Sequence, residues 1–306
     1  MRNTSKDSTG IIVNYRSIIR KLWKPYFFIA PSLILILVLY VVPIKDVIYF
    51  SFHKVHTILG VEGYNGIQNF VKMFDPSFIN ILWRTFAWIC ISSPLALIIG
   101  FFLALLLNKD MPGKKLFRAL VIVPWAIPHS IVAVFWSWFV HHQYGYLNAI
   151  LIQLGLVDRG ITFLSVNMAF CTIIAMRVWK TAPFAALNIL AALQTIPEEV
   201  YDAAKVDGAE GWRFLLNVIL PQIKGTIITI ALITTIWAAT TFDMIWVLTE
   251  GGPLGSTEIL PLTIYKQAFF SYDAGVASAG AIMNIVLILS VTILYWRTTL
   301  KKGDAA

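Results

Sequence analysis

The sequence predicts an all-α membrane protein with six transmembrane helices. Of its 306 residues, 58% are hydrophobic and only 13% are charged, and the mean hydropathy is +0.75. A soluble domain carries about 25% charged residues. Several apolar runs are also long enough to cross a hydrocarbon layer about 30 Å thick, which takes roughly 20 helical residues. Composition and run length together exclude a water-soluble fold.

Six segments have the length and composition of membrane spans, and four of them contain no Asp, Glu, Lys or Arg. In chain order the predicted spans are residues 26–44, 85–108, 119–140, 166–196, 225–249 and 276–296. The fourth span contains Arg177 and Lys180, and the fifth contains Asp243. The first span follows basic residues, as a signal peptide core does. Its apolar run is longer than a signal core and no small-residue cleavage pattern follows, so we expect a retained anchor.

The basic residues are distributed unevenly among the loops. Sixteen of the 24 Lys and Arg residues lie before the first span, after the second and fourth spans, or after the sixth, and four lie in the opposite loops. The positive-inside rule therefore predicts a cytoplasmic N-terminal segment (1–25), a six-span domain (26–296) and a cytoplasmic tail (297–306). The net charge of +8 reflects this orientation. We expect no nucleic-acid binding, because the basic residues form no single patch interleaved with aromatic residues.

Motifs of catalysis and metal binding are missing from the sequence. Cys90 and Cys171 lie in apolar runs, where a thiol behaves as a small hydrophobic group. His129, His141 and His142 match no metal-ligand spacing, and we interpret them as interfacial or packing residues. There is no G-x-x-x-x-G-K-[ST] phosphate loop. We therefore expect no catalytic residue, no metal site and no cofactor bound by the chain itself.

The predicted cytoplasmic loop 197–221 has the local chemistry of two short helices on the membrane surface. Pro197 suits a first helical position, and Glu199 opposes the positive end of the helix dipole. Gly208 can adopt the left-handed conformation that ends the first helix. Pro221 is expected to mark the point where the second helix stops or bends.

The spacing within this loop resembles the signature of binding-protein-dependent ATP-binding-cassette importer permeases. That signature reads Glu-Ala-Ala, three residues, Gly, nine residues, Ile-x-Leu-Pro. This chain has Asp202-Ala203-Ala204, three residues, Gly208, nine residues, then Val218-Ile219-Leu220-Pro221. Asp replaces Glu and Val replaces Ile. Further similar segments are residues 66–70, 108–118, 123–128, 178–180 and 248–253.

These segments cover nearly the whole chain and look most like the carbohydrate branch of that family. The branch includes the maltose, multiple-sugar and glycerol-phosphate systems, and the match is to the subunit with a Gly-Gly-Pro loop after the fifth span. The resemblance implies a type I importer permease fold with a cytoplasmic coupling helix. It also implies residence in the cytoplasmic (inner) membrane of a bacterium or archaeon. The implied function is carbohydrate translocation driven by ATP hydrolysis on another subunit.

The same resemblance implies the partners of the chain. They are a homologous second permease subunit, a cytoplasmic ATPase dimer that binds ATP and Mg²⁺, an extracytoplasmic solute-binding protein, a sugar-like solute and membrane lipid. The residues implied to couple to the ATPase are Glu199, Asp202, Ala203, Ala204, Gly208, Leu220 and Pro221. Small alanines permit close approach, and Asp202 can pair with a basic residue of the partner. The alternative is an ordinary amphipathic helix under the bundle, with Gly208 only a C-cap.

Two criteria select candidate residues of the solute pathway: the energetic cost of placing a polar or charged group within a membrane span, and the position of the residue along the chain. Ionisable groups within spans normally face the bundle interior or water. Aromatic rings offer apolar faces to sugar rings, and hydroxyls offer hydrogen bonds. The resemblance places solute contacts on the spans before and after the loop, where Ala238 and Thr241 stand in place of amides. The candidates are Lys180, Thr181, Phe184, Thr234, Trp237, Thr241 and Asp243.

Three alternatives remain open for the ionisable residues. Asp243 could be the ion-binding carboxylate of a cation-coupled secondary transporter. Arg177 and Lys180 could supply the counter-charge of an anionic or other non-sugar solute. Lys180 could also snorkel or pair with Asp243 for assembly alone.

Overall fold

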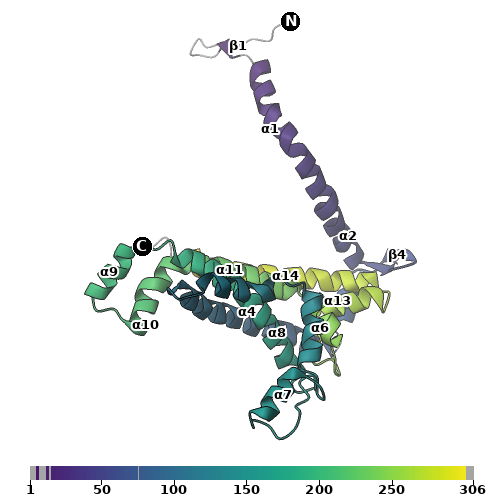
Figure 1. Ribbon diagram of the computed structural model, residues 1–306. Coiled ribbons are helices and arrows are strands. Elements are labelled where there is room, and N and C mark those ends of the chain that lie inside the picture. Colours follow the sequence, from purple (N-terminus) through teal and green to yellow (C-terminus); the bar gives the residue numbers. More distant parts are fainter. Residues whose placement is uncertain (1–4, 7–11, 14, 75, 301–306) are drawn as a thin grey trace.

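The computed structural model of the chain describes residues 5–6, 12–13, 15–74 and 76–300, and most of these residues are helical (Figure 1). The elements are β1 (Ser5–Lys6), β2 (Ile12–Val13), α1 (Tyr15–Ile36), the π-helical segment η1 (Leu37–Val41), α2 (Val42–Ser51), β3 (His53–His56), β4 (Gly60–Tyr64), α3 (Gln68–Met73), α4 (Phe78–Asn108), α5 (Lys114–Ala126), α6 (His129–Phe139), α7 (Tyr146–Gln153), α8 (Ala169–Leu193), α9 (Glu198–Val206), α10 (Gly211–Phe214), the π-helical segment η2 (Leu215–Ile219), α11 (Leu220–Thr240), α12 (Asp243–Thr249), α13 (Leu260–Phe269) and α14 (Ala274–Leu300).

The prediction of six spans is confirmed if one bent pair of helices counts as a span. Among the described residues, five helical stretches are long and apolar enough to cross a membrane, and α5 with α6 forms the bent sixth. The five are Tyr26–Ser51, Phe78–Asn108, Ala169–Leu193, Gly211–Thr240 and Ala274–Ile293. The predicted tail 297–306 is helical as far as Leu300, and residues 301–306 lie outside the described part.

The predicted third span, 119–140, is not one straight helix. The axes of α5 and α6 meet at 98°. Pro128 is the cause, because a proline disfavours the helical conformation of the residue before it and has no N–H to continue the helix. Ile127 accordingly adopts an extended conformation (φ −75°, ψ 138°), and α6 begins directly after Pro128.

The predicted fifth span also differs from the structure at both ends. Pro221 does not stop the helix, which runs from Gly211 to Thr240 as one membrane-length stretch. A π turn precedes Pro221, in which the amide of Leu220 donates to the carbonyl of Leu215, five residues back. The hydrogen-bond register of the helix therefore changes directly before Pro221, which has no N–H group to donate. At the other end the helix stops at Thr240. Thr241 is extended, and a separate helix, α12, begins at Asp243.

Helices α4, α8, α11 and α14 form the bundle, and α8 lies at its centre (Figure 1). In its apolar stretch 72% of the residues are buried, against 33% in α4. Small residues allow α4 and α8 to approach closely, since a Cβ atom on Gly100 would lie 2.6 Å from Cβ of Ala185. The best-buried large side chain in this region is Trp88 of α4, which donates through Nε1 to the carbonyl of Ala238.

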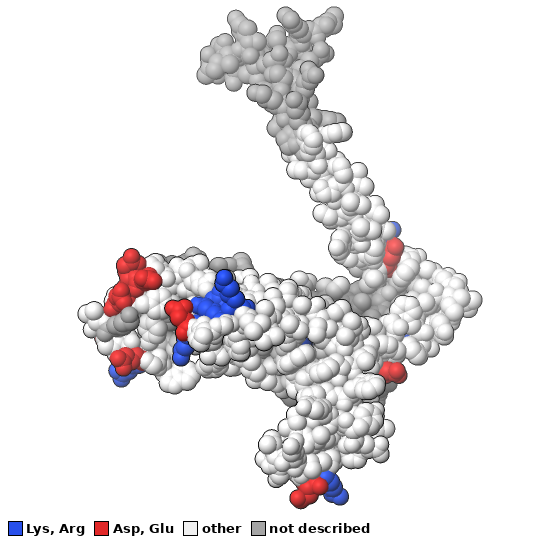
Figure 2. Space-filling model, in the orientation of Figure 1, with Lys and Arg blue, Asp and Glu red and all other residues white. Residues whose placement is uncertain are grey.

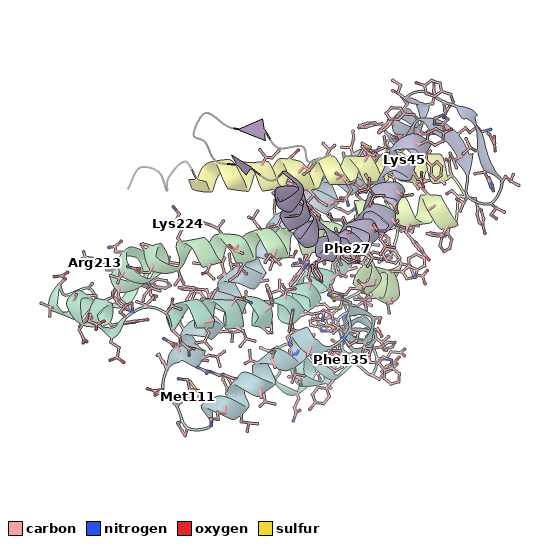
Figure 3. The ribbon with its side chains drawn as sticks, turned by 90° about the horizontal axis from the view of Figure 1, so that it is seen from above. Phe27, Lys45, Met111, Phe135, Arg213 and Lys224 are labelled. Atoms are coloured by element: carbon pink, nitrogen blue, oxygen red, sulfur yellow. The ribbon has the colours of Figure 1, made fainter. Side chains whose placement is uncertain are left out.

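Helices α1 and α2 project away from the bundle (Figure 1), and Figure 3 shows Phe27 on the projecting part. None of the residues in the most apolar stretch of Tyr26–Ser51 is buried within the chain. The base of α2 packs beside α14 and leaves a wholly apolar hollow of about 480 Å³. This first span therefore needs lipid or another subunit around most of its surface.

The bundle has two distinct ends. The first carries α9, α10 and the end of α14, and Figure 3 shows Arg213 and Lys224 there. The opposite end carries the β3–β4 hairpin, in which His53 pairs with Tyr64, together with α13. The loop that carries α7 projects from the bundle beyond α6 (Figure 1). In Figure 2 acidic residues cluster over the α9–α10 end, with basic residues beside them. The loop between the fourth and fifth spans thus shares an end with the C-terminal part of α14.

Candidate functional site

A cavity of about 450 Å³ lies where the two broken spans meet α8. Its size is within the range of ligand pockets in proteins. It is lined by Trp125, Ile127, Pro128, His129, Arg177, Lys180, Thr181, Trp237, Thr240, Thr241, Asp243 and Met244. The α5–α6 break supplies one wall and the α11–α12 break another. Both departures from the predicted spans therefore contribute directly to the candidate site.

His129 and Asp243 connect these two walls. Each is the first residue of its helix, and His129 Nδ1 lies 3.3 Å from Asp243 Oδ2. Both side chains remain about half exposed, at 50% and 51%. The other carboxylate oxygen of Asp243 accepts a hydrogen bond from the amide of Met244. The pair thus presents a polar edge, with an acceptor carboxylate, to the cavity.

Lys180 lies on α8 with its ammonium directed at the end of α5. Nζ donates to the carbonyl oxygens of Trp125 at 3.2 Å, Pro124 at 3.4 Å and Ile127. Within the described residues it forms no ion pair, so the pairing with Asp243 that the sequence allowed is not formed. The counter-charge of Lys180 is instead the negative end of a helix dipole.

Arg177 lies one turn earlier on α8 and holds the bundle together from inside. Its guanidinium donates to Ser92 Oγ at 3.1 Å and to the carbonyl of Thr234 at 2.7 Å, which tie α8 to α4 and α11. It also lies 5.5 Å from the ring centre of Trp88, within the range of a cation–π contact. Only 3% of the residue is exposed, so its charge borders the cavity from a packed position.

Aromatic rings form the apolar part of the site. Phe184 stacks on Trp125 at 5.7 Å between ring centres and tilts against Trp237 at 4.7 Å. Trp125 and Trp237 line the cavity, whereas Phe184 supports both rings from behind. Thr241 lines the cavity too, but its hydroxyl donates to the carbonyl of Trp237 at 2.7 Å. That hydroxyl retains its acceptor capacity for a solute.

The structure brings together five of the seven predicted pathway residues. The other two do not line the cavity, since Phe184 lies behind its rings and Thr234 is fully buried, with its hydroxyl bonded to the carbonyl of Ile230 one turn back. Ala238, at another contact position that the resemblance indicates, is fully buried as well. The five residues that line the cavity are Lys180, Thr181, Trp237, Thr241 and Asp243.

The sequence interpretation misses several lining residues, of which Trp125 and His129 carry the functional groups discussed above. It interprets His129 as an interfacial or packing residue because this histidine matches no metal-ligand spacing, and its partner Asp243 is far along the chain. The signal that could have found both is the proline at position 128, because a helix break inside a span exposes backbone and end residues to a cavity.

The first part of the loop 197–221, as far as Gly208, has the local geometry that the sequence predicts, whereas the predicted second short helix is the beginning of the span Gly211–Thr240. Gly208 takes a left-handed conformation (φ +67°), with the amide of Ala209 bonded to the carbonyl of Ala204 at 2.9 Å. This is the bond pattern of a Schellman C-cap. Ala204 packs inward, and Ala203 and Asp202 are exposed.

The surface of α9 and the loop after it is strongly acidic, as Figure 2 shows at that end of the molecule. The exposed acidic residues are Glu198, Glu199, Asp202, Asp207 and Glu210. Of the last two signature positions, Leu220 is partly buried and Pro221 is exposed. The loop therefore presents a compact helix with a negative outer face.

Comparisons with known proteins agree with this architecture. The family described as binding-protein-dependent transport system inner membrane component matches residues 96–297. The sulfoquinovosyl glycerol transport system permease protein SmoG of Agrobacterium fabrum is 37% identical over 271 residues, covering 88% of each chain. The trehalose/maltose transport system permease protein MalF of Thermococcus litoralis is 35% identical over 272 residues, covering 88% of this chain and 91% of the relative.

A solved structure shows the same fold. It is the crystal structure of a bacterial ATP-binding-cassette transporter involved in the import of the acidic polysaccharide alginate, with a TM-score of 0.82 and 24% identity. The alignment covers 93% of this chain and 98% of that chain. With the family match over more than half of the chain, these relatives confirm the resemblance seen in the sequence. The chain belongs to the inner-membrane permease components of binding-protein-dependent ATP-binding-cassette transport systems.

Proposed function

We propose that this permease translocates a neutral, sugar-sized solute and that the solute contacts the cavity between the two broken spans. The observation that carries the proposal is the composition of the cavity wall, with tryptophan faces on one side and the His129–Asp243 edge on the other. Rings of saccharides stack on tryptophan, and their hydroxyls donate to carboxylates. The relative named for trehalose/maltose supports a neutral carbohydrate. The relative named for sulfoquinovosyl glycerol supports a carbohydrate but not its neutrality, because that solute carries a sulfonate.

An anionic solute is the second candidate, because Arg177 and Lys180 both line the cavity. The contacts of these residues favour a neutral solute. The three donors of the Lys180 ammonium face three backbone carbonyls, and Arg177 is bonded to Ser92 and Thr234. Of the ionisable residues that line the cavity, His129 and Asp243 are the most exposed, and a carboxylate repels an anion.

The acidic loop helix α9 is the proposed contact with the ATPase. Its exposed carboxylates, Asp202 and Glu199 among them, fit a basic cleft, and Ala203 permits close approach of the partner. ATP and Mg²⁺ would bind to that partner, and a second permease would complete the pathway. The family description, binding-protein-dependent, supports a solute-binding protein as a further partner. It also favours ATP-driven import over the cation-coupled carrier considered for Asp243.

The proposed orientation places α9, α10 and both termini in the cytoplasm. It rests on the uneven distribution of basic residues, sixteen against four, between the two sets of loops. The arrangement of the bundle is compatible with it, since the end of α14 lies at the same end of the molecule as α9 and α10 (Figures 1 and 3).

Uptake by the reconstituted importer tests the proposed solute class. Proteoliposomes would contain this chain with its second permease, ATPase and binding protein, and would be supplied with ATP inside and radiolabelled maltose or trehalose outside. We expect ATP-dependent accumulation that other neutral sugars inhibit and glucuronic acid does not. Liposomes without the ATPase are the control. ATP-dependent accumulation of radiolabelled glucuronic acid, without accumulation of either neutral sugar, would establish the anionic alternative instead.

A further inference from the structure

The break between α5 and α6 creates an electrostatic problem within the membrane-spanning region. The last carbonyl groups of a helix have no partner in that helix, and they carry the negative end of its dipole. At the depth of the membrane such groups need water or another protein group as a hydrogen-bond partner, because hydrocarbon offers none. Here the helix ends at Ala126, and the chain turns by 98° before α6 begins at His129.

Lys180 supplies hydrogen-bond donors and a positive charge to the carbonyl groups at the end of α5. An ammonium group has three N–H donors. The Lys180 ammonium lies within hydrogen-bond distance of the carbonyls of Pro124, Trp125 and Ile127. These are the carbonyls at the end of α5 and of the first residue beyond it. The side chain comes from a different helix, α8, and only 5% of the residue is exposed.

We propose that Lys180 is a positioning residue, a tethered cation that caps α5 and thereby fixes the direction in which α6 leaves the break. In membrane transporters with broken helices, half-helix ends and unwound carbonyls bind mobile cations such as Na⁺. In this chain the carbonyl cage has the same chemistry, and a covalently attached ammonium occupies it. The inference goes beyond the proposed function, because it depends neither on the solute nor on the partner subunits.

The cap also determines the cavity wall. Ile127 and Pro128 line the cavity and follow directly on the capped carbonyls, and His129, the next residue, reaches Asp243 on α12. An unfixed end of α5 would let α6 change its angle and would draw His129 away from Asp243. Lys180 therefore acts on the shape of the site through the backbone of the break.

The distance between the outer ends of α5 and α6 measures the angle at the break. Spin labels on Leu116→Cys and Trp138→Cys would report it in the full chain in nanodiscs, with Cys90 and Cys171 replaced. Both label sites are exposed, at 66% and 67%. We expect one narrow distance distribution in the parent, a broadened or shifted one in Lys180→Met, and the parent distribution in Lys180→Arg, which keeps a multidentate cation.

Arg177→Met is the matched control, because it removes the other buried cation of α8, whose bonds go to α4 and α11. It should lower thermal stability without changing the α5–α6 distance. Thr181→Val, which alters a neighbouring lining residue, should change neither. An unchanged distribution in Lys180→Met, or the same broadening in Arg177→Met, would overturn the proposal.

Chemical rescue of a Lys180 variant distinguishes two roles of this side chain, a cation that caps α5 and a side chain that only fills space. Lys180→Ala removes three methylene carbons and the ammonium, a fragment that n-propylammonium matches in length and charge. We expect millimolar n-propylammonium to narrow the distance distribution of Lys180→Ala and to raise its thermal midpoint, and n-propanol at equal concentration to do neither. Equal effects of the two compounds, or no effect of either, would show that Lys180 only fills space.

Discussion

The imidazole of His129 and the carboxylate of Asp243 lie 3.3 Å apart and join two helices that both begin at a break within the bundle. We expect the two residues to be energetically coupled. A double-mutant cycle with His129→Ala and Asp243→Asn should give a coupling energy of roughly 0.2–1 kcal/mol, as expected for a half-exposed pair. Thermal unfolding in detergent measures it, and additive effects of the two substitutions would contradict a contact between them.

Removal of an aromatic ring at the cavity should lower solute uptake more than it lowers the yield of folded, assembled complex. Phe184→Ala removes the ring that contacts both Trp125 and Trp237 and should lower uptake and relax selectivity between sugars. Trp237→Ala should lower uptake further, since Trp237 itself lines the cavity. Trp83→Ala is a control on the exposed surface of α4. Loss of the assembled complex in both cavity variants would instead identify the rings as packing residues.

Close packing of α4 on α8 predicts a sharp difference between two glycines. A Cβ on Gly100 would lie 2.6 Å from Ala185 Cβ and 2.8 Å from the carbonyl oxygen of Ala182, so Gly100→Ala must separate the helices. We expect a loss of about 1–3 kcal/mol in the free energy of unfolding. Gly225→Ala, in α11 with open space around it, should be neutral or slightly stabilising. Equal thermal midpoints for the two variants would argue against close packing at Gly100.

The turn after α9 predicts the behaviour of substitutions at Gly208. Its φ of +67° is costly for a β-branched residue, by about 1–2 kcal/mol, although the space that a Cβ would occupy there is open. Gly208→Val should therefore reduce solute-stimulated ATP hydrolysis while the chain remains expressed. Gly208→Asn should retain most of the solute-stimulated ATP hydrolysis, because asparagine tolerates the left-handed conformation better than valine does.

A second variant of the same loop tests its charge. Asp202→Lys reverses one exposed carboxylate of the acidic face and should weaken association with the ATPase. Copurification of the two subunits at increasing salt would measure this. Wild-type coupling in both Gly208→Val and Asp202→Lys would remove the loop from the mechanism.

Much of the fold follows from the sequence because apolar runs of membrane length are a strong and local signal. The breaks at positions 127–128 and 241–242 are harder to predict, since hydropathy averages over a window and does not register a change of direction. Pro128 carries information about the first break, whereas Pro221 suggests a break that does not exist. A proline in a π turn or a first helical turn leaves the helix intact, and the surrounding backbone decides which case applies.

The sequence predicts which charged residues belong to the candidate site, but it does not predict the groups that they contact. Lys180 and Asp243 stand out because charges in spans are costly, yet the sequence suggests pairing them with each other. The structure pairs Asp243 with His129 and gives Lys180 three backbone carbonyls. Backbone groups released by a helix break have no sequence signature of their own, so a partner of this kind is visible only once the break is known.

The orientation of the chain can be tested with single cysteines at two highly exposed positions. Leu254, 92% exposed, lies in the loop before α13, and Val206, 88% exposed, ends α9. In a background without Cys90 and Cys171, a membrane-impermeant maleimide added to intact cells should label Leu254→Cys and not Val206→Cys. Labelling of Val206→Cys from outside would invert the proposed topology. The control is permeabilised cells that lack the ATPase, in which α9 is uncovered and both sites should react.

One helical stretch connects the two functional ends of the molecule. Gly211–Thr240 is a membrane-length span of 30 residues, about 45 Å long at 1.5 Å per residue. One end adjoins the α9 loop, and the other adjoins Thr241 and Asp243. If this helix tilts as a rigid body about its middle, its two ends move in opposite directions. A tilt of about 5° displaces each end by roughly 2 Å. If the proposed coupling at the loop tilts this helix, we expect the cavity wall to move in the opposite direction to the loop, with no relay of side chains in between.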